Sequence, residues 1–234
     1  MKIEDLKRGL IVSCQATPEE PLHGPQFMAR MALAAEIGGA VGVRINSAID
    51  IAAVKEIVKL PIIGIIKQDY PGSYVRITPT LKEIRAVYEA GADIVAVDCT
   101  FRERPDGMDV ASLIANVKRE FPELLLMADI RDFEEGIFAW KQGADIVATT
   151  LAGYPDDLTK SDVPLEFMPP SLDLVCELAD AVDIPVIAEG RIWSSENAVK
   201  ALKNGAHAVV IGASITRPQV ITQRIVSEIN GYLN

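Results

Sequence analysis

Short apolar segments alternate along this chain with amphipathic ones, a pattern typical of parallel β-strands separated by helices. The apolar segments are nearly continuous, as expected for strands that helices cover on the outside. Helix-start signals fall between them, in the pairs Thr80 and Glu83, Asp132 and Glu135, and Ser194 and Asn197. We expect eight strands, at Leu10–Cys14, Val41–Arg44, Ile62–Lys67, Ile94–Asp98, Leu124–Asp129, Ile146–Thr149, Val186–Glu189 and Val209–Gly212.

An internal repeat supports this count. A turn of small residues precedes a β-branched strand four times, at positions 38, 91, 143 and 205, which are 53, 52 and 62 residues apart. Each repeat has room for two strand–helix units, and eight such units in series close into a barrel. The pattern therefore predicts an α/β fold, a (β/α)8 TIM barrel that forms a single domain over residues 1–234. A doubly wound open sheet is the main alternative, but no Gly-x-Gly-x-x-Gly follows the first strand.

Composition narrows the classes of partner. The 234 residues are 49% hydrophobic, enough for one sizeable core, and 33 acidic against 23 basic residues give a net charge of -10. This charge repels nucleic acid and anionic membranes, so we expect neither as a partner. The chain has no run of about 18 apolar residues and no signal-peptide pattern at its start, and we expect a cytoplasmic protein. Three cysteines without close pairing predict neither disulfides nor a zinc site, and no other metal spacing is evident.

Polar residues close most of the predicted strands. Active sites of such barrels lie at the carboxyl ends of the strands, so these residues should converge on one mouth. A single residue of this kind could merely be solvated or cap the next helix, but six charged or amide ends out of eight favour a site. The candidates are Gln15, Arg44, Lys67, Asp98, Asp129, Thr149 or its neighbour Thr150, and Glu189.

Lys67 and Glu189 are the strongest catalytic candidates. Lys67 ends a strongly apolar strand, where desolvation lowers an amine pKa, and the same effect raises the pKa of Glu189. A direct ion pair between them would oppose both shifts. Strands three and seven are opposite in an eight-stranded barrel, so the two groups should face each other across the mouth. This arrangement suits inversion of a carbon beside a carbonyl, with one group removing a proton and the other returning one to the opposite face.

A phosphate site is predicted after the last two strands, its usual position in this fold. Small residues there let a phosphate approach the backbone, and an arginine can add a bidentate contact. The candidates are Gly190, Arg191, Gly212, Ala213 and Arg217. Two long connections, residues 68–79 and 151–170, follow strands three and six on the same side of the barrel and are candidate functional loops.

The chain resembles the N-acetylmannosamine-6-phosphate 2-epimerase family nearly end to end. The matching segments include Gly9–Ala16, Glu20–Leu22, Pro61–Lys67, Ile77–Thr80, Met127–Ile130, Thr149–Leu151, Glu189–Ile192 and Ile215–Pro218. Departures from the family pattern occur at Ile45–Ser47, Cys99 and Arg131–Phe133. The first of these lies beside Arg44 and could alter the shape of that loop.

The resemblance implies interconversion of N-acetyl-D-mannosamine 6-phosphate and N-acetyl-D-glucosamine 6-phosphate in sialic acid breakdown, with no cofactor. It also implies that Lys67 and Glu189 are catalytic and that Gln15, Arg44, Asp129 and Arg217 contact the substrate. A homodimer follows from the same analogy. The last helix, Pro218 to Leu233, carries an apolar stripe that could pack on its own barrel or on a partner's.

Two other functions fit parts of the pattern. A buried lysine of lowered pKa equally suits a Schiff-base aldolase acting on a sugar phosphate, with Lys67 as nucleophile. A non-catalytic phosphosugar-binding protein would keep the phosphate loops but would not need Lys67 opposite Glu189. A racemase with Cys14 and Cys99 as paired thiols is disfavoured, because alternation along the strands directs both thiols away from the barrel interior if Gln15 and Asp98 point inward.

Overall fold

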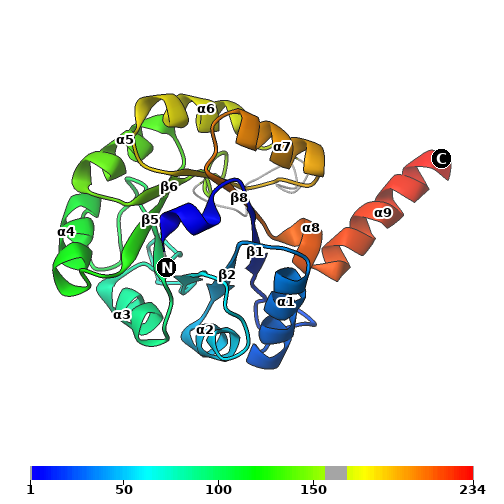
Figure 1. Ribbon diagram of the computed structural model, residues 1–234, viewed down its shortest axis with the longest axis horizontal. Helices are drawn as coiled ribbons and strands as arrows, with labels where there is room; N and C mark the ends of the chain where they lie inside the picture. The colour runs from blue at the N-terminus through cyan, green and yellow to red at the C-terminus, as the bar shows by residue number, and fades with distance from the viewer. Residues whose placement is uncertain (1, 156–167, 234) are drawn as a thin grey trace.

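The computed structural model of the protein describes residues 2–155 and 168–233. Its strands pair in parallel and in sequence order, and β8 pairs with β1, so the described strands form a closed barrel (Figure 1). This confirms the predicted (β/α)8 fold and excludes the open sheet. The strands are β1 (Leu10–Cys14), β2 (Gly42–Asn46), β3 (Ile62–Ile65), β4 (Ile94–Asp98), β5 (Leu125–Asp129), β6 (Ile146–Ala148), β7 (Val186–Glu189) and β8 (Ala208–Ile211).

Helices cover the outside of the barrel (Figure 1). The three predicted helix starts are confirmed: Asp132 and Ser194 each accept a hydrogen bond from the backbone N–H three residues on, and Thr80 forms a capping box with Glu83. The helices are η1 (Ile3–Leu6), α1 (Pro25–Ile37), α2 (Ala48–Lys55), α3 (Leu81–Glu89), α4 (Val110–Glu120), α5 (Phe133–Gln142), α6 (Leu172–Ala181), α7 (Ser195–Lys203), α8 (Ala213–Thr216) and α9 (Pro218–Leu233).

The third strand is shorter than its apolar run predicts. It ends at Ile65, because the following connection folds back on the chain: Thr78 N–H donates to the Ile66 carbonyl at 2.8 Å, and Lys67 forms an antiparallel bridge with Ile77. Both backbone groups of Ile66 are therefore bonded to Thr78 of the 68–79 connection. This fold-back fixes Lys67 at the rim of the barrel.

Buried side chains form two layers, as alternation along each strand requires. One layer fills the barrel interior and includes Ile11, Ile63 and Met127; the other lies between strands and helices and includes Cys14 and Cys99. The two thiols thus lie outside the barrel interior, as predicted. Burial raises the pKa of Cys14 to about 12, which leaves that thiol protonated and unreactive.

The amino-terminal end of the barrel is covered by η1. Leu6 of this helix is fully buried and packs in the interior layer with Ile11 and Ile63. His207 holds the helix in place, since its ring contacts the Ile3 carbonyl at 3.1 Å and its carbonyl accepts from Arg8 N–H. His207 is therefore structural and lies away from the carboxyl ends of the strands.

The last helix, α9, projects from the barrel (Figure 1). Its base is held by a hydrogen bond from Gln219 to Glu20 and by Arg224, whose guanidinium lies 4.6 Å from the centre of the Trp193 ring. Beyond this base, Ile225 and Ile229 are each 53% exposed. The outer part of the apolar stripe predicted on this helix therefore does not pack on the barrel, whereas Val220 and Ile221 at its base are only partly exposed. Among the described residues, no helix combines the length and apolarity needed to cross a membrane.

Candidate active site

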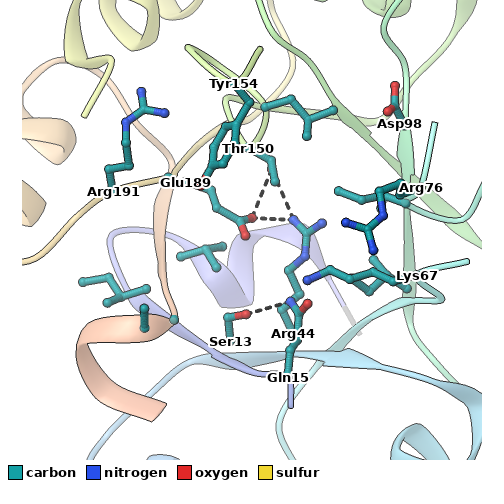
Figure 2. Close-up of a pocket in the computed structure, with 18 of the residues that line it drawn as sticks. Ser13, Gln15, Arg44, Lys67, Arg76, Asp98, Thr150, Tyr154, Glu189 and Arg191 are labelled. Carbon is teal, nitrogen blue, oxygen red and sulfur yellow. Dashed lines mark hydrogen bonds and ion pairs between the residues drawn. The ribbon is translucent and has the colours of Figure 1, made fainter. Parts of the chain in front are cut away.

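A cavity of about 590 Å³ opens at the carboxyl ends of the strands, where the sequence places the candidate residues (Figure 2). Ten predicted site residues line it: Gln15, Arg44, Lys67, Asp98, Glu189, Gly190, Arg191, Gly212, Ala213 and Arg217. Two others, Asp129 and Thr149, lie behind the cavity wall and contact residues that line it. The structure thus brings the predicted set together around one mouth.

Arg44, from β2, forms the centre of the site. Its side chain is only 1% exposed, and its two terminal nitrogens donate to the two carboxylate oxygens of Asp129 at 3.1 and 2.5 Å. It also donates to Glu189 and to the Thr150 hydroxyl. Burial alone would lower the pKa of Arg44, but the charges of the two carboxylates outweigh it and raise that pKa. The guanidinium is therefore a permanent positive charge.

Glu189 ends β7 and uses only one carboxylate oxygen for these contacts. Its Oε2 accepts from Arg44 and, at 3.2 Å, from Thr150, whereas its Oε1 has no partner among the residues that the structure describes. Burial raises the pKa of Glu189, the charge of Arg44 opposes that shift, and Asp129 adds to it. One oxygen is thus anchored and the other is left for a ligand.

Lys67 presents a free amine to the cavity. Its backbone N–H donates to Asn46 at 2.8 Å, but its side-chain nitrogen has no hydrogen bond or ion pair within the described ranges. Desolvation by the surrounding protein lowers its pKa to about 8, and the charges of Arg217 and Arg44 act in the same direction. Solvent still reaches the side chain through the open mouth. A substantial neutral fraction near pH 8 follows from this pKa.

The two threonines after β6 have different places. Thr149 is buried, and its hydroxyl bonds both the carbonyl and the N–H of Glu189 at 3.1 Å, which fixes the backbone of that residue. Thr150 lines the cavity and donates to Asp129 at 2.6 Å. Asp129 itself is fully buried. Thr149 and Asp129 therefore act on a cavity ligand only through the residues that they hold.

Gln15 and Asp98 complete the floor of the cavity. Gln15 donates to the Ser13 hydroxyl at 2.7 Å, and its carbonyl oxygen Oε1 is buried without a partner. Asp98, at the end of β4, accepts from the N–H and hydroxyl of Thr100 at 2.9 and 2.6 Å. Burial raises the pKa of Asp98, and these hydrogen bonds oppose the shift. Both side chains line the same cavity as Lys67.

Backbone N–H groups line the side of the cavity after β7 and β8. Those of Gly190, Arg191 and Ala213 donate to no described residue. Gly190 has a φ of 111°, a conformation that favours glycine, and it turns the chain away from the strand end. These unused donors are what an anion such as phosphate requires.

The two arginines of this region differ in availability. Arg191 points away from Lys67 (Figure 2), and its guanidinium donates to the carbonyl of Pro169 and the hydroxyl of Ser171, both at 3.0 Å, and to the Ala152 carbonyl. Arg217 donates to Glu20 at 2.9 Å and lines the cavity. Arg191 therefore connects both ends of the predicted loop 151–170, of which residues 156–167 lie outside the described residues.

Several cavity residues were missed by the sequence analysis. Ser13 lies two positions before Gln15 on the same face of β1, so the alternation of the strand could have identified it. Arg76 falls within the long connection already singled out. Tyr154 and Trp193 carry no signal in one sequence. Among the described residues, no group of three or more His, Cys, Asp or Glu side chains could hold a metal ion.

Comparisons with known proteins agree on one family. The family model described as "NanE: Putative N-acetylmannosamine-6-phosphate epimerase" matches residues 28–231. A protein of Caldanaerobacter subterraneus subsp. tengcongensis named "Putative N-acetylmannosamine-6-phosphate 2-epimerase" is 50% identical over 225 residues, which cover 96% of this chain and 92% of that protein. A protein of the same name from Listeria monocytogenes serovar 1/2a is 44% identical, covering 97% of this chain and 94% of the relative.

Solved structures show the same relationship. The N-acetylmannosamine-6-phosphate 2-epimerase from Clostridium perfringens superposes with a TM-score of 0.88 at 44% identity, covering 96% of this chain and 95% of that chain. Thiamine phosphate pyrophosphorylase from Pyrococcus furiosus has a TM-score of 0.57 at 20% identity, over 97% and 98% of the two chains, and shares the fold alone.

Proposed function

The chain belongs to the N-acetylmannosamine-6-phosphate epimerase family and is an isomerase, and we propose that it inverts C2 of its substrate by proton transfer through Lys67 and Glu189. The reaction interconverts N-acetyl-D-mannosamine 6-phosphate and N-acetyl-D-glucosamine 6-phosphate. The observation that carries the mechanism is the pair of unpartnered groups in one cavity, the Lys67 amine and the Glu189 Oε1. We propose that it needs no cofactor, because these groups and the neighbouring arginine supply the acid, the base and the positive charge.

The proton transfer requires the open-chain form of the substrate, in which C1 is an aldehyde beside C2. One of the two groups removes the C2 proton, and the electron pair moves onto the aldehyde oxygen to give a planar enolate. The other group then delivers a proton to the opposite face of C2, and the carbonyl is restored. The lowered pKa of Lys67 favours a neutral amine that accepts a proton, and the raised pKa of Glu189 favours a carboxylic acid that donates one.

We propose that Arg44 stabilises the enolate oxygen, since a fixed guanidinium does not have to reorganise as negative charge develops. Gln15 and Asp98 would bind sugar hydroxyls from the cavity floor. Asp129 and Thr149 belong to the site as positioning residues: Asp129 orients Arg44, and Thr149 orients Glu189.

The substrate phosphate would lie after β7 and β8. The unused N–H groups of Gly190, Arg191 and Ala213 support this position, and Gly212 leaves room beside them. Arg217 lines the same region and can turn from the partly exposed Glu20 toward a phosphate. Arg191 would contribute its backbone N–H, since its guanidinium already holds three acceptors.

We further propose a cytoplasmic homodimer that acts in sialic acid breakdown. The exposed apolar stripe of α9, with Ile225, Val226 and Ile229, supports pairing with a second copy, because an isolated apolar helix face in water is unfavourable.

The direct test is to incubate the protein with N-acetyl-D-glucosamine 6-phosphate in heavy water and to follow the C2 proton by NMR. Loss of that signal together with formation of the mannosamine epimer is expected. Absence of both would disprove the proposal. Borohydride treatment in the presence of a sugar phosphate separates the aldolase alternative, because a covalent adduct on Lys67 forms only if the amine makes a Schiff base.

A further inference from the structure

Arg76 is a cavity arginine to which the proposed mechanism gives no task. It lies in the connection between β3 and α3, where its carbonyl accepts from Gln68 N–H at 3.0 Å and the next residue, Ile77, forms the bridge with Lys67. These contacts fix the backbone of Arg76 beside the lysine. Figure 2 shows its side chain next to that of Lys67, on the side of the cavity away from Arg191.

The partner of Arg76 is weakly held. Its guanidinium pairs with Asp69 through two contacts, Nη2 with Oδ2 at 2.9 Å and Nε with Oδ1, and the side chains of the two residues are 48% and 73% exposed. Water reaches both side chains and can replace the ion pair, so the guanidinium can turn to a ligand at modest cost. Its Nη1 has no partner among the described residues.

Two of the other cavity arginines are bound to the protein more firmly than Arg76. Arg44 is buried between two carboxylates, and Arg191 donates to three groups of the chain that bounds the cavity. On the β3 side of the mouth, next to the proposed base, Arg76 is thus a cation whose position is fixed and whose donors can be released. A donor at this place contacts whatever substituent the reacting carbon carries.

The proposed phosphate position decides which substituent that is. With the phosphate after β7 and β8 and C2 at Lys67, the sugar chain crosses the cavity, and the 2-acetamido group lies at the β3 side. Its carbonyl oxygen is a strong acceptor, and guanidinium N–H groups donate strongly to such oxygens. Holding this group limits rotation about the bond between C1 and C2 and keeps the C2 proton directed at the lysine.

We propose, on the basis of the proposed function, that Arg76 donates a hydrogen bond to the acetamido carbonyl of the substrate and determines specificity for N-acylated sugars. Glucose 6-phosphate provides the matched ligand, because it carries a hydroxyl in place of the acetamido group. The contact should therefore strengthen binding of N-acetylglucosamine 6-phosphate and leave binding of glucose 6-phosphate unchanged.

The test is calorimetric titration of both sugar phosphates into the wild-type protein and into Arg76→Gln. Removal of one charged donor should weaken N-acetylglucosamine 6-phosphate about tenfold, while glucose 6-phosphate changes less than about twofold. Arg76→Lys, which keeps a charged donor, should recover part of the loss. Asp69→Asn is the control: it removes the ion pair but keeps the guanidinium, so the preference for the acetamido ligand should persist.

A second measurement excludes a merely structural effect. The positive charge of Arg76 is one of several that lower the pKa of Lys67, so Arg76→Gln should move the acid limb of kcat/KM to slightly higher pH, and Arg76→Lys should not. Equal weakening of both ligands, or no weakening of either, would overturn the proposal. The titrations report binding whether or not the ligand is converted, so a wild-type protein that fails to exchange the C2 proton refutes the proposed function and leaves the assignment of Arg76 to the titrations.

Discussion

Lys67 and Glu189 face each other across the cavity, one after β3 and the other at the end of β7, four strands apart around the closed barrel. Arg44 lies between them and is bonded to Glu189 but not to Lys67 (Figure 2). The carboxylate is thus neutralised by the arginine rather than by the lysine. Lys67 therefore keeps the lowered pKa that desolvation gives it, and the pKa of Glu189 stays raised because the effect of burial outweighs the opposing charge of Arg44.

Removal of the lysine amine should abolish proton transfer. Lys67→Met keeps most of the length of the side chain and loses the base, so kcat should fall by about 10² to 10⁴, the usual contribution of one acid–base group. Binding of the substrate should remain, since the phosphate donors are unchanged. The rate is measured by C2 exchange and the affinity by calorimetry. Lys141→Met, outside the cavity, is the control and should behave as wild type, and a fall in both variants would contradict this role.

The rate should depend on pH through the same amine. Because the pKa of Lys67 is lowered to about 8, the neutral base predominates above that pH and is lost below it. We expect kcat/KM to fall by about tenfold per pH unit on the acid side of about pH 8. Steady-state rates measured between pH 5.5 and 9.5 test this, and a profile that stays flat down to pH 6 would rule out Lys67 as the base.

Glu189→Gln should separate exchange from inversion. The amide can keep a hydrogen bond to Thr150 but cannot transfer a proton, so only the face of C2 served by Lys67 stays active. In heavy water we expect N-acetylglucosamine 6-phosphate or its epimer, whichever presents its C2 proton to Lys67, to exchange without conversion. Proton NMR of both epimers reports this. Continued conversion at the wild-type rate would show that a single base suffices.

Arg44→Ala should destabilise the fold strongly. The change leaves the buried carboxylate of Asp129 and that of Glu189 close together without a cation, and breaking a buried ion pair in this way typically costs about 3–5 kcal/mol. Urea unfolding at pH 7 measures the loss. The loss in the free energy of unfolding should become smaller as the pH falls, because protonation removes the negative charge that the variant leaves without a cation. A loss as large at pH 5 as at pH 8 would indicate a packing defect instead.

The proposed dimer depends on the exposed face of α9. Ile225→Glu with Ile229→Glu places two charges on that stripe and should yield a folded monomer, detectable by light scattering coupled to size exclusion. Ser227→Glu adds a charge about half a turn away and should leave the assembly intact. If the wild-type protein is already monomeric, the stripe has another role.

The fold was predictable because each strand is a separate apolar run and most of these runs end in a polar residue. Contacts between distant residues were not predictable. Arg44 and Asp129 are 85 positions apart, and nothing in the sequence around either residue indicates that they pair. Both appeared in sequence as independent candidates. The structure shows one guanidinium held by the other's carboxylate, which places Arg44 in the cavity and Asp129 behind it.

Two adjacent positions show a second limit. Thr149 and Thr150 follow the same strand, and alternation cannot assign them once the strand has ended at Ala148. The chain turns there, which directs Thr150 into the cavity and leaves Thr149 bound to the backbone of Glu189. Arg191 shows the same limit. Its place in a loop is evident from the sequence, but its three acceptors are set by how residues 152 and 169–171 come together in the fold.

The distribution of charge around the mouth has a kinetic consequence. Described cavity residues include six cationic side chains and three carboxylates, within a chain whose net charge is -10. The net charge opposes the approach of an anion, whereas cationic side chains outnumber carboxylates among the described residues of the mouth. Such a local excess of positive charge guides a diffusing ligand toward the opening, and dissolved salt screens both the repulsion and the guidance.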